Sequence, residues 1–208
     1  MPLADFQSAI GTMIAVAATG NPLSDEIRTS LDSLQLTDTE KAWVQAMPQT
    51  RGFNVSCAIQ RWWRETRMRD LAKLTIQTLG PECADQMIAA YLQQNICTSL
   101  FFLPETLAFL GFVAERSDHP HHHAIAQFER ALLQAQEAAR QMGNSNPTTT
   151  LIEFYAPPEA ILAAVLQGGA LPEPTVEPFF VLVSSALPHL WRPVAAEDLP
   201  HQTHVKTA

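Results

Sequence analysis

The stretch that decides the fold is Thr149-Thr150-Leu151-Ile152-Glu153-Phe154-Tyr155. It is rich in β-branched and aromatic residues, which predicts a β-strand. Successive side chains of a strand point to opposite faces, so Leu151, Glu153 and Tyr155 would share one face and Ile152 and Phe154 the other. Because the chain before this stretch reads as helix, the sequence predicts a change from helical to mixed structure here.

Three further patterns complete a small unit after this strand. Pro157-Pro158-Glu159 begins a helix that ends at Gly168-Gly169. The apolar run 179–183 predicts a second strand that is buried on both faces. The run 190–194 predicts a third, which Pro193 restricts to a sheet edge or a bulge. A β-α-β-β unit of about 50 residues buries too little surface to be stable alone, so we expect it to pack against the helical part.

The chain before the strand predicts a bundle of helices. Apolar residues recur at steps of three and four near the N-terminus and again from Ile125 to Met142. Thr37-Asp38-Thr39-Glu40 has the form of a capping box, and Gly80-Pro81 ends one helix and begins the next. The expected helices are 3–18, one that Ser24 caps, 37–47, 53–79 as one bent or two consecutive helices, 81–95, 104–116 and 120–142.

The fold class that follows is α+β, a mostly α-helical N-terminal bundle with a small C-terminal β-α-β-β unit that carries a three-stranded sheet. Gly143-Asn144-Ser145-Asn146-Pro147 suits a helix cap followed by a linker. We therefore predict a helical domain at 1–143, a small α+β domain at 148–200 and a tail at 201–208.

The composition is that of a globular protein, with 47% hydrophobic and 16% charged residues among 208. No unbroken apolar run reaches the length of about 18 residues that a membrane span needs. Asp5 precedes the apolar stretch 8–19 where a secretory signal would carry basic residues, so a cytoplasmic location is expected. Three widely spaced cysteines without a CxxC pattern indicate reduced thiols rather than a disulfide framework or a zinc site.

The net charge of −8 argues against broad electrostatic binding to nucleic acid. Basic residues nevertheless concentrate between 51 and 73, which indicates either a solvated helix face or a docking surface for an acidic partner. Trp62 and Trp63 diverge by about 100° on a helix, so we expect one in the core and one facing outward. Tryptophan and arginine are enriched at interface hot spots. The candidate partner-interface residues are Arg61, Trp62, Arg64 and Arg67.

The histidine cluster His119-Pro120-His121-His122-His123 is a candidate metal site, since neutral imidazoles bind transition metals. Adjacent histidines at a helix start point in different directions, however, and His119 precedes the helix. A solvated helix start is therefore the favoured interpretation, with no metal ligand assigned. The sequence has neither a GxSxG elbow nor a phosphate-binding glycine loop, so no catalytic residue is assigned either.

A small sheet with an exposed edge can accept an extended peptide as an added strand. The first strand is the candidate for that edge, unless the C-terminal tail covers it. The candidate peptide-binding residues on this strand are Leu151, Ile152, Glu153, Phe154 and Tyr155.

A set of short motifs occurs in order between residues 51 and 132. They are Arg51-Gly52-Phe53, Arg61-Trp62-Trp63-Arg64-Glu65-Thr66-Arg67, Leu79-Gly80-Pro81-Glu82, Tyr91-Leu92, Ser99-Leu100-Phe101-Phe102, Phe109-Leu110 and Ala126-Gln127-Phe128-Glu129-Arg130-Ala131-Leu132. This order resembles that of the MbnC-like partner proteins of methanobactin biosynthesis, and the resemblance covers residues 50–195. They belong to a wider group of partner proteins to multinuclear non-haem iron enzymes that modify cysteines in ribosomally made peptides.

The resemblance implies a non-catalytic subunit that forms a heterodimer with an iron enzyme of TIM-barrel type. The pair would bind the leader of a precursor peptide, and the enzyme would convert core cysteines to oxazolone and thioamide groups with dioxygen, giving a copper chelator. The iron would lie in the partner enzyme, with no cofactor in this chain. Residues 149–155 and 179–184 would hold the leader, which adds Phe180 and Leu182 to the peptide-binding candidates.

Two other functions stay open. Some members of the wider family are described as DNA-binding proteins, which would make the C-terminal unit winged-helix-like. The segment 149–208 holds only Arg192 and Lys206 as fixed positive charges, which argues against that function. The third hypothesis is a small metal-binding protein that uses the histidines from His119 to His123.

Overall fold

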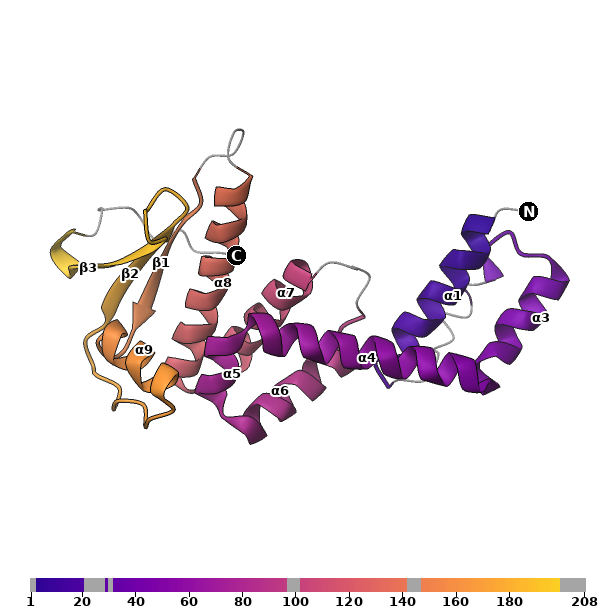
Figure 1. Ribbon diagram of the computed structural model, residues 1–208, viewed down its shortest axis with the longest axis horizontal. Coiled ribbons are helices and arrows are strands. Elements are labelled where there is room, and N and C mark those ends of the chain that lie inside the picture. Colours follow the sequence, from indigo (N-terminus) through magenta and orange to yellow (C-terminus); the bar gives the residue numbers. More distant parts are fainter. Residues whose placement is uncertain (1–2, 21–28, 30–31, 97–101, 142–146, 199–208) are drawn as a thin grey trace. The chain divides into compact units, whose positions relative to one another are not determined.

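The computed structural model describes residues 3–20, 29, 32–96, 102–141 and 147–198 (Figure 1). The helices are α1 Leu3–Ala17, α3 Asp38–Ala46, α4 Arg51–Leu71, α5 Lys73–Leu79, α6 Pro81–Gln94, α7 Phe102–Arg116, α8 Pro120–Arg140 and α9 Pro158–Gln167. The strands are β1 Thr149–Phe154, β2 Phe179–Ser184 and β3 Trp191–Val194, and short 3-10 turns cover Met47–Gln49 and Ala196–Asp198. The predicted α+β class, with a helical N-terminal part and a three-stranded sheet, is confirmed.

Two compact units make up the chain. Met1–Leu71 and Asp85–Glu105 form the first, and Ala72–Ala84 and Thr106–Ala208 form the second, which carries the sheet. The predicted domains at 1–143 and 148–200, with a tail at 201–208, remain a prediction about which segments fold independently.

Local signals in the sequence set several helix boundaries. The capping box at α3 is present, with the Thr37 N–H donating to the Glu40 carboxylate at 2.8 Å and Thr37 Oγ1 accepting from the Glu40 N–H at 3.3 Å. Helices α4 and α5 are consecutive, and Gly80 takes a φ of +74° before Pro81 begins α6. Helix α7 begins two residues before Pro104. The predicted helix start at Ser24 and the linker at 143–146 lie outside the described residues.

Helix α5 begins without a capping side chain of its own, because its N-cap residue is Ala72. Glu129 of α8 supplies the missing acceptor: its two carboxylate oxygens accept the N–H groups of Leu74 at 2.9 Å and Thr75 at 2.8 Å. A helix N-terminus favours a negative group at this place. Burial raises the pKa of Glu129, and the hydrogen bonds from Thr75 and Leu74 oppose that rise. This carboxylate therefore ties α5 to α8.

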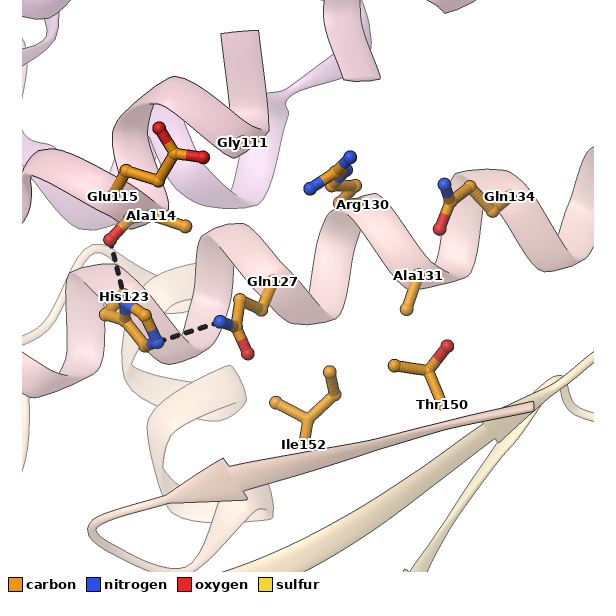
Figure 2. A pocket seen from close by; sticks show the side chains of 10 residues that line it. All are labelled: Gly111, Ala114, Glu115, His123, Gln127, Arg130, Ala131, Gln134, Thr150 and Ile152. Carbon is orange, nitrogen blue, oxygen red and sulfur yellow. Dashed lines mark hydrogen bonds between the residues drawn. The ribbon is translucent and has the colours of Figure 1, made fainter. Parts of the chain in front are cut away.

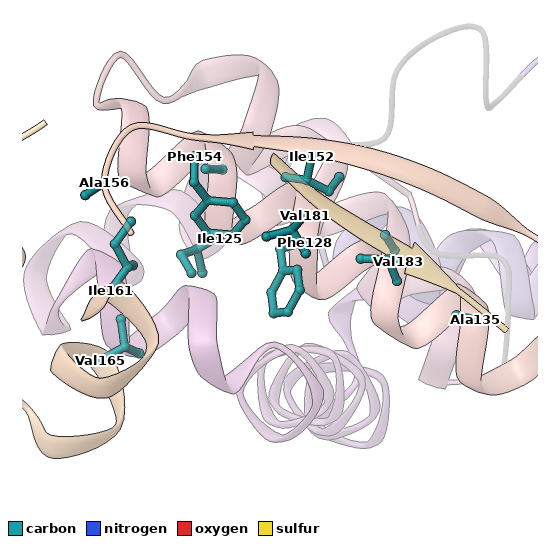
Figure 3. Close-up of a cluster of buried hydrophobic side chains, with 12 residues drawn as sticks. Ile125, Phe128, Ala135, Ile152, Phe154, Ala156, Ile161, Val165, Val181 and Val183 are labelled. Atoms are coloured by element: carbon teal, nitrogen blue, oxygen red, sulfur yellow. The ribbon is translucent and has the colours of Figure 1, made fainter. Parts of the chain in front are cut away.

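The three strands form an antiparallel sheet in the order β1-β2-β3, which puts β1 and β3 at its edges (Figure 1). The core of this unit lies between one face of the sheet and helices α8 and α9 (Figure 3). Phe128 of α8 contacts the rings of Phe154 and Trp191 edge to face, each with a centroid distance of 5.6 Å. The prediction that the small unit packs against a helix of the N-terminal part is confirmed.

The predicted burial of strand β2 is wrong for one of its two faces. The run 179–183 was expected to be buried on both faces, but within it only the side chains of Val181 and Val183 are buried, while the alternate residues Phe180 and Leu182 are half-buried. The physical reason is that the buried core lies on one face of the sheet only. Pro193 lies in edge strand β3, where its missing N–H removes no required ladder bond, as predicted.

Among the described residues, no helix is both long enough and apolar enough to cross a bilayer.

Candidate functional site

Strand β1 has an open side. The carbonyl of Thr148 accepts the N–H of Ser185 at 3.2 Å, so the backbone N–H and C=O of Thr148 face the β2 side. In an antiparallel strand the N–H and C=O of one residue point to the same side, and those of the next residue point to the other side. The backbone groups of Thr150, Ile152 and Phe154 therefore face β2, and those of Thr149, Leu151 and Glu153 face away. Since β1 ends the sheet, no strand of the described chain pairs with that second side.

The connection between α9 and β2 closes one end of this open side. The carbonyl of Tyr155, just beyond β1, accepts hydrogen bonds from the N–H of Thr175 at 2.5 Å and from its hydroxyl at 3.0 Å. The stretch of β1 left for pairing is thus Thr149 to Glu153, about 17 Å of extended chain at roughly 3.4 Å per residue.

A groove of about 370 Å³ lies beside this strand, bounded by α7, α8 and β1 (Figure 2). Its volume falls in the range of about 300–1,000 Å³ that is typical of ligand sites. Its lining residues are Gly111, Ala114 and Glu115 of α7, His123, Gln127, Arg130, Ala131 and Gln134 of α8, and Thr150 and Ile152 of β1. Polar side chains of α8 and small side chains together give a surface that suits a peptide better than a purely apolar ligand.

His123 is a structural member of this groove. Its Nδ1 lies 2.7 Å from the carbonyl oxygen of Ala114, and its Nε2 lies 2.8 Å from the amide nitrogen of Gln127 (Figure 2). A carbonyl only accepts, so Nδ1 carries the proton and Nε2 accepts from the Gln127 amide. Both ring nitrogens are engaged, so His123 fixes α8 against α7 and presents no free nitrogen to a metal or a substrate.

Arg130 and Glu115 are the charged groups of the groove. The Arg130 guanidinium lies against Gly111, where an added Cβ would come within 3.2 Å of Nη1. Glu115 lies one helical turn along α7 from Gly111. Both side chains are exposed, and neither forms an ion pair with any residue of the described ranges. The groove therefore presents one unpaired cation and one unpaired carboxylate at different places.

The prediction that the histidine cluster is a solvated helix start is only partly right, because one of its histidines is buried. His121 is fully buried, and its Nε2 donates to the carbonyl of Pro172 at 2.8 Å. His119 caps α8 by accepting the His121 N–H at 3.3 Å and stacks on His122. Burial lowers the pKa of His122, and the neighbouring histidines lower it further. In the part of the chain that the structure describes, no three His, Cys, Asp or Glu side chains come together as a metal site.

The candidate peptide-binding residues divide between the two faces of the sheet. Leu151 lies directly opposite Leu182, and Glu153 lies opposite Phe180, so these four share the outer face, with Leu151 and Glu153 exposed. Tyr155 beyond the strand is half-buried. Ile152 and Phe154 are 2% and 0% exposed. The Phe154 side chain packs on α8 in the core, so Phe154 could meet a peptide only through its backbone, whereas Ile152 is buried but borders the groove. That these residues bind a peptide stays a prediction.

Arg64 was predicted to lie in a partner interface, but it is buried inside the protein. Its guanidinium is fully buried in the first unit, where Nε donates to Glu105 Oε1 at 2.5 Å and Nη2 donates to the carbonyl of Asn95 at 2.7 Å. A buried charge needs such partners, and a residue in this position offers no surface to another protein. Arg61 is half-buried and pairs with Glu65 at 3.2 Å, and Arg67 is half-buried.

Trp62 and Trp63 also differ from the prediction, because both are exposed, by 57% and 41%. Their rings contact each other edge to face at 5.0 Å. Val55 and Ile59 are exposed by 48% and 50%, so Val55, Ile59 and Trp62 form an apolar stripe at helical spacing on α4. An exposed apolar stripe of this kind is typical of an interaction surface.

Only one residue of the groove, Gly111, carries a signal in the sequence. A glycine inside a helix usually has a packing reason, and Gly111 in the middle of α7 makes room for Arg130. The other lining residues come together only through tertiary structure. No protein-family model, no curated protein and no solved structure matches this chain.

Proposed function

We propose that this protein is a non-catalytic recognition subunit that holds an extended peptide as an added strand on β1. The observation that carries the proposal is the open side of β1, where the N–H and C=O groups of Thr149, Leu151 and Glu153 point outward, on a strand that also borders the groove through Thr150 and Ile152. Main-chain hydrogen bonds would supply affinity, and alternate side chains would supply selectivity. The buried core beneath β1 keeps the edge in one conformation before the peptide arrives.

The peptide in this proposal is the leader of a ribosomally made precursor. The subunit would present the precursor's cysteines to a multinuclear iron enzyme that forms oxazolone and thioamide groups, as in methanobactin biosynthesis. The order of motifs between residues 51 and 132 supports this assignment, together with the edge strand. Under this proposal the iron lies in the partner enzyme, and this chain supplies binding and orientation.

A second surface would bind the enzyme. The apolar stripe Val55, Ile59 and Trp62 is exposed on α4, and Arg51 and Arg61 lie on the same helix. Exposed tryptophan beside arginine is the composition of interface hot spots. The stripe therefore suits an apolar partner surface with acidic residues around it.

The partner assignment is tested with the neighbouring genes. If they encode an iron enzyme and a short cysteine-bearing peptide, this chain and the enzyme are co-expressed and analysed by size exclusion. The proposal expects them to elute together at micromolar concentration and expects the enzyme alone to modify the peptide poorly. Separate elution, or full activity of the enzyme alone, would contradict it.

The binding mode is tested at Leu151, whose N–H faces the open side. Leu151→Pro removes that donor without removing a bond to β2, so the sheet should persist, since an edge strand tolerates proline at such a position. Binding of the synthetic leader peptide should weaken at least about tenfold, while the control Leu151→Val, which keeps the N–H, should bind as the wild type does. If Leu151→Pro and wild type bind the leader peptide equally well, the peptide does not bind as an added strand on β1.

A further inference from the structure

We infer that the groove selects peptides with an acidic side chain, which Arg130 binds at the end of the groove near Thr150. The inference rests on the proposed function and deepens it, because it names the chemical class of the peptide. It is built from three features: the position of Arg130 on Gly111, the direction of side chains in an added strand, and the distribution of charge around the groove.

Gly111 of α7, which has no side chain, leaves space for the Arg130 guanidinium beside the groove. The guanidinium occupies space on α7 that any side chain at Gly111 would enter, since a Cβ there would lie 3.2 Å from Nη1 and 3.5 Å from Cζ. Figure 2 shows Arg130 on the α7 side of the groove and Thr150 and Ile152 on the β1 side. The charge has no acidic partner within the described segments, so its donors remain available to a ligand carboxylate.

An added strand would send alternate side chains toward this cation. Thr150 and Ile152 both line the groove, so the peptide residues beside them would point to the same face of the sheet. Two such residues lie about 6.8 Å apart. Figure 2 shows Ile152 near His123 and Gln127, and Thr150 nearer Ala131 and Gln134. Arg130 directly precedes Ala131 on α8, so the peptide side chain beside Thr150 comes near the turn of α8 that carries Arg130.

The position of Glu115 determines at which end of the groove an acidic peptide side chain can bind. Glu115 is the other charged group that lines the groove, and it comes from the turn of α7 that holds Ala114, the partner of His123. A ligand carboxylate at that end would meet like charge, whereas at the Arg130 end it meets an unpaired guanidinium that can bind it with two parallel hydrogen bonds. The net charge of −8 disfavours an acidic peptide elsewhere on this protein, which makes the local cation decisive.

The experiment is an mRNA-display selection of random 12-residue peptides on the immobilised full chain. The C-terminus of each peptide is linked to its message, so a free terminal carboxylate is not offered. Wild type should enrich Asp and Glu at least fivefold over the input at one position, two residues from an apolar one. Arg130→Gln should remove this preference, and Arg130→Glu should replace it with Lys and Arg. The matched control Arg140→Gln changes an exposed arginine of the same helix and should keep the acidic preference.

Gly111→Ala separates recognition from folding. Alanine favours the helical conformation more than glycine does, so the melting temperature should not fall. The added methyl group would displace the guanidinium, and the acidic preference should decline at least threefold.

The outcomes distinguish this inference from the function on which it rests. If wild type enriches no peptide, or if the enriched peptides bind Leu151→Pro equally well, the proposed function fails and this inference fails with it. If peptides are enriched and lost on Leu151→Pro, but show no acidic preference or keep it in Arg130→Glu, only the role of Arg130 is overturned.

Discussion

Replacement of Glu129 by alanine tests how α5 is held against α8. The Glu129 carboxylate of α8 accepts the N–H groups of Leu74 and Thr75, and α5 has no capping side chain of its own. In Glu129→Ala both donors lose their acceptor in a site that excludes most water, because Thr75 is fully buried. The prediction is that α5 loosens from α8 and that the second unit loses stability.

The size of the loss follows from the two orphaned donors. Each buried N–H without a partner costs about 1–3 kcal/mol. The carboxylate itself is costly to bury, as its raised pKa shows, and its removal offsets part of the loss. We therefore expect Glu129→Ala to lower the free energy of unfolding by about 2–4 kcal/mol, a large share of the roughly 5–15 kcal/mol of a typical domain.

Urea unfolding followed by far-ultraviolet circular dichroism at pH 7 measures this change. Glu137→Ala is the matched control, since Glu137 lies on the same helix, is partly exposed, and pairs only with nearby Arg140 and Gln141. The control should stay within about 0.5 kcal/mol of wild type. If Glu129→Ala also stays within that range, the carboxylate is not the cap of α5 and the reasoning is wrong.

Three further predictions concern the same chain. Because the pKa of Glu129 is raised, the folded state holds this proton more tightly than the unfolded state does. The free energy of unfolding of wild type relative to Glu129→Gln should therefore be highest below pH 4.5 and decline as pH rises. Urea titrations across pH 4–8 measure this difference. Arg64→Ala should cost about 3–5 kcal/mol in the same assay because Glu105 stays buried without its partner, and replacing both by leucine should restore most of that loss. Trp62→Ala should weaken the proposed complex with a partner enzyme at least about tenfold in interferometry without changing the melting temperature, whereas Trp43→Ala, at a similarly exposed tryptophan of α3, should leave its affinity unchanged.

The sequence predicts the parts of this fold that depend on local chemistry. The capping box at Thr37, the Gly80-Pro81 turn and the glycine after α9 each end or begin a helix by interactions within a few residues. The β-branched stretch 149–155 likewise forms the edge strand. The division of its side chains between two faces follows directly from the strand period, which is why the outer-face residues could be named.

The parts that could not be predicted depend on partners far away along the chain. Arg64 reads as a surface charge in a basic helix, and its partner Glu105 lies 41 residues later. Glu129 reads as an ordinary polar position of α8, although it caps a helix 54 residues earlier. His121 is buried and bonds to the carbonyl of Pro172, which lies 51 residues later, and no local pattern reveals this contact. The groove needs three elements at once, so its residues share no spacing in the sequence.

Amide hydrogen exchange along β1 tests the central claim most directly. In the free protein, the N–H groups of Thr150 and Ile152 should exchange slowly because they bond to β2, and those of Leu151 and Glu153 should exchange fast. With a saturating selected peptide, the account predicts that Leu151 and Glu153 become protected at least tenfold while their neighbours change little. Unchanged fast exchange at both residues, with the peptide shown to be bound, would contradict it.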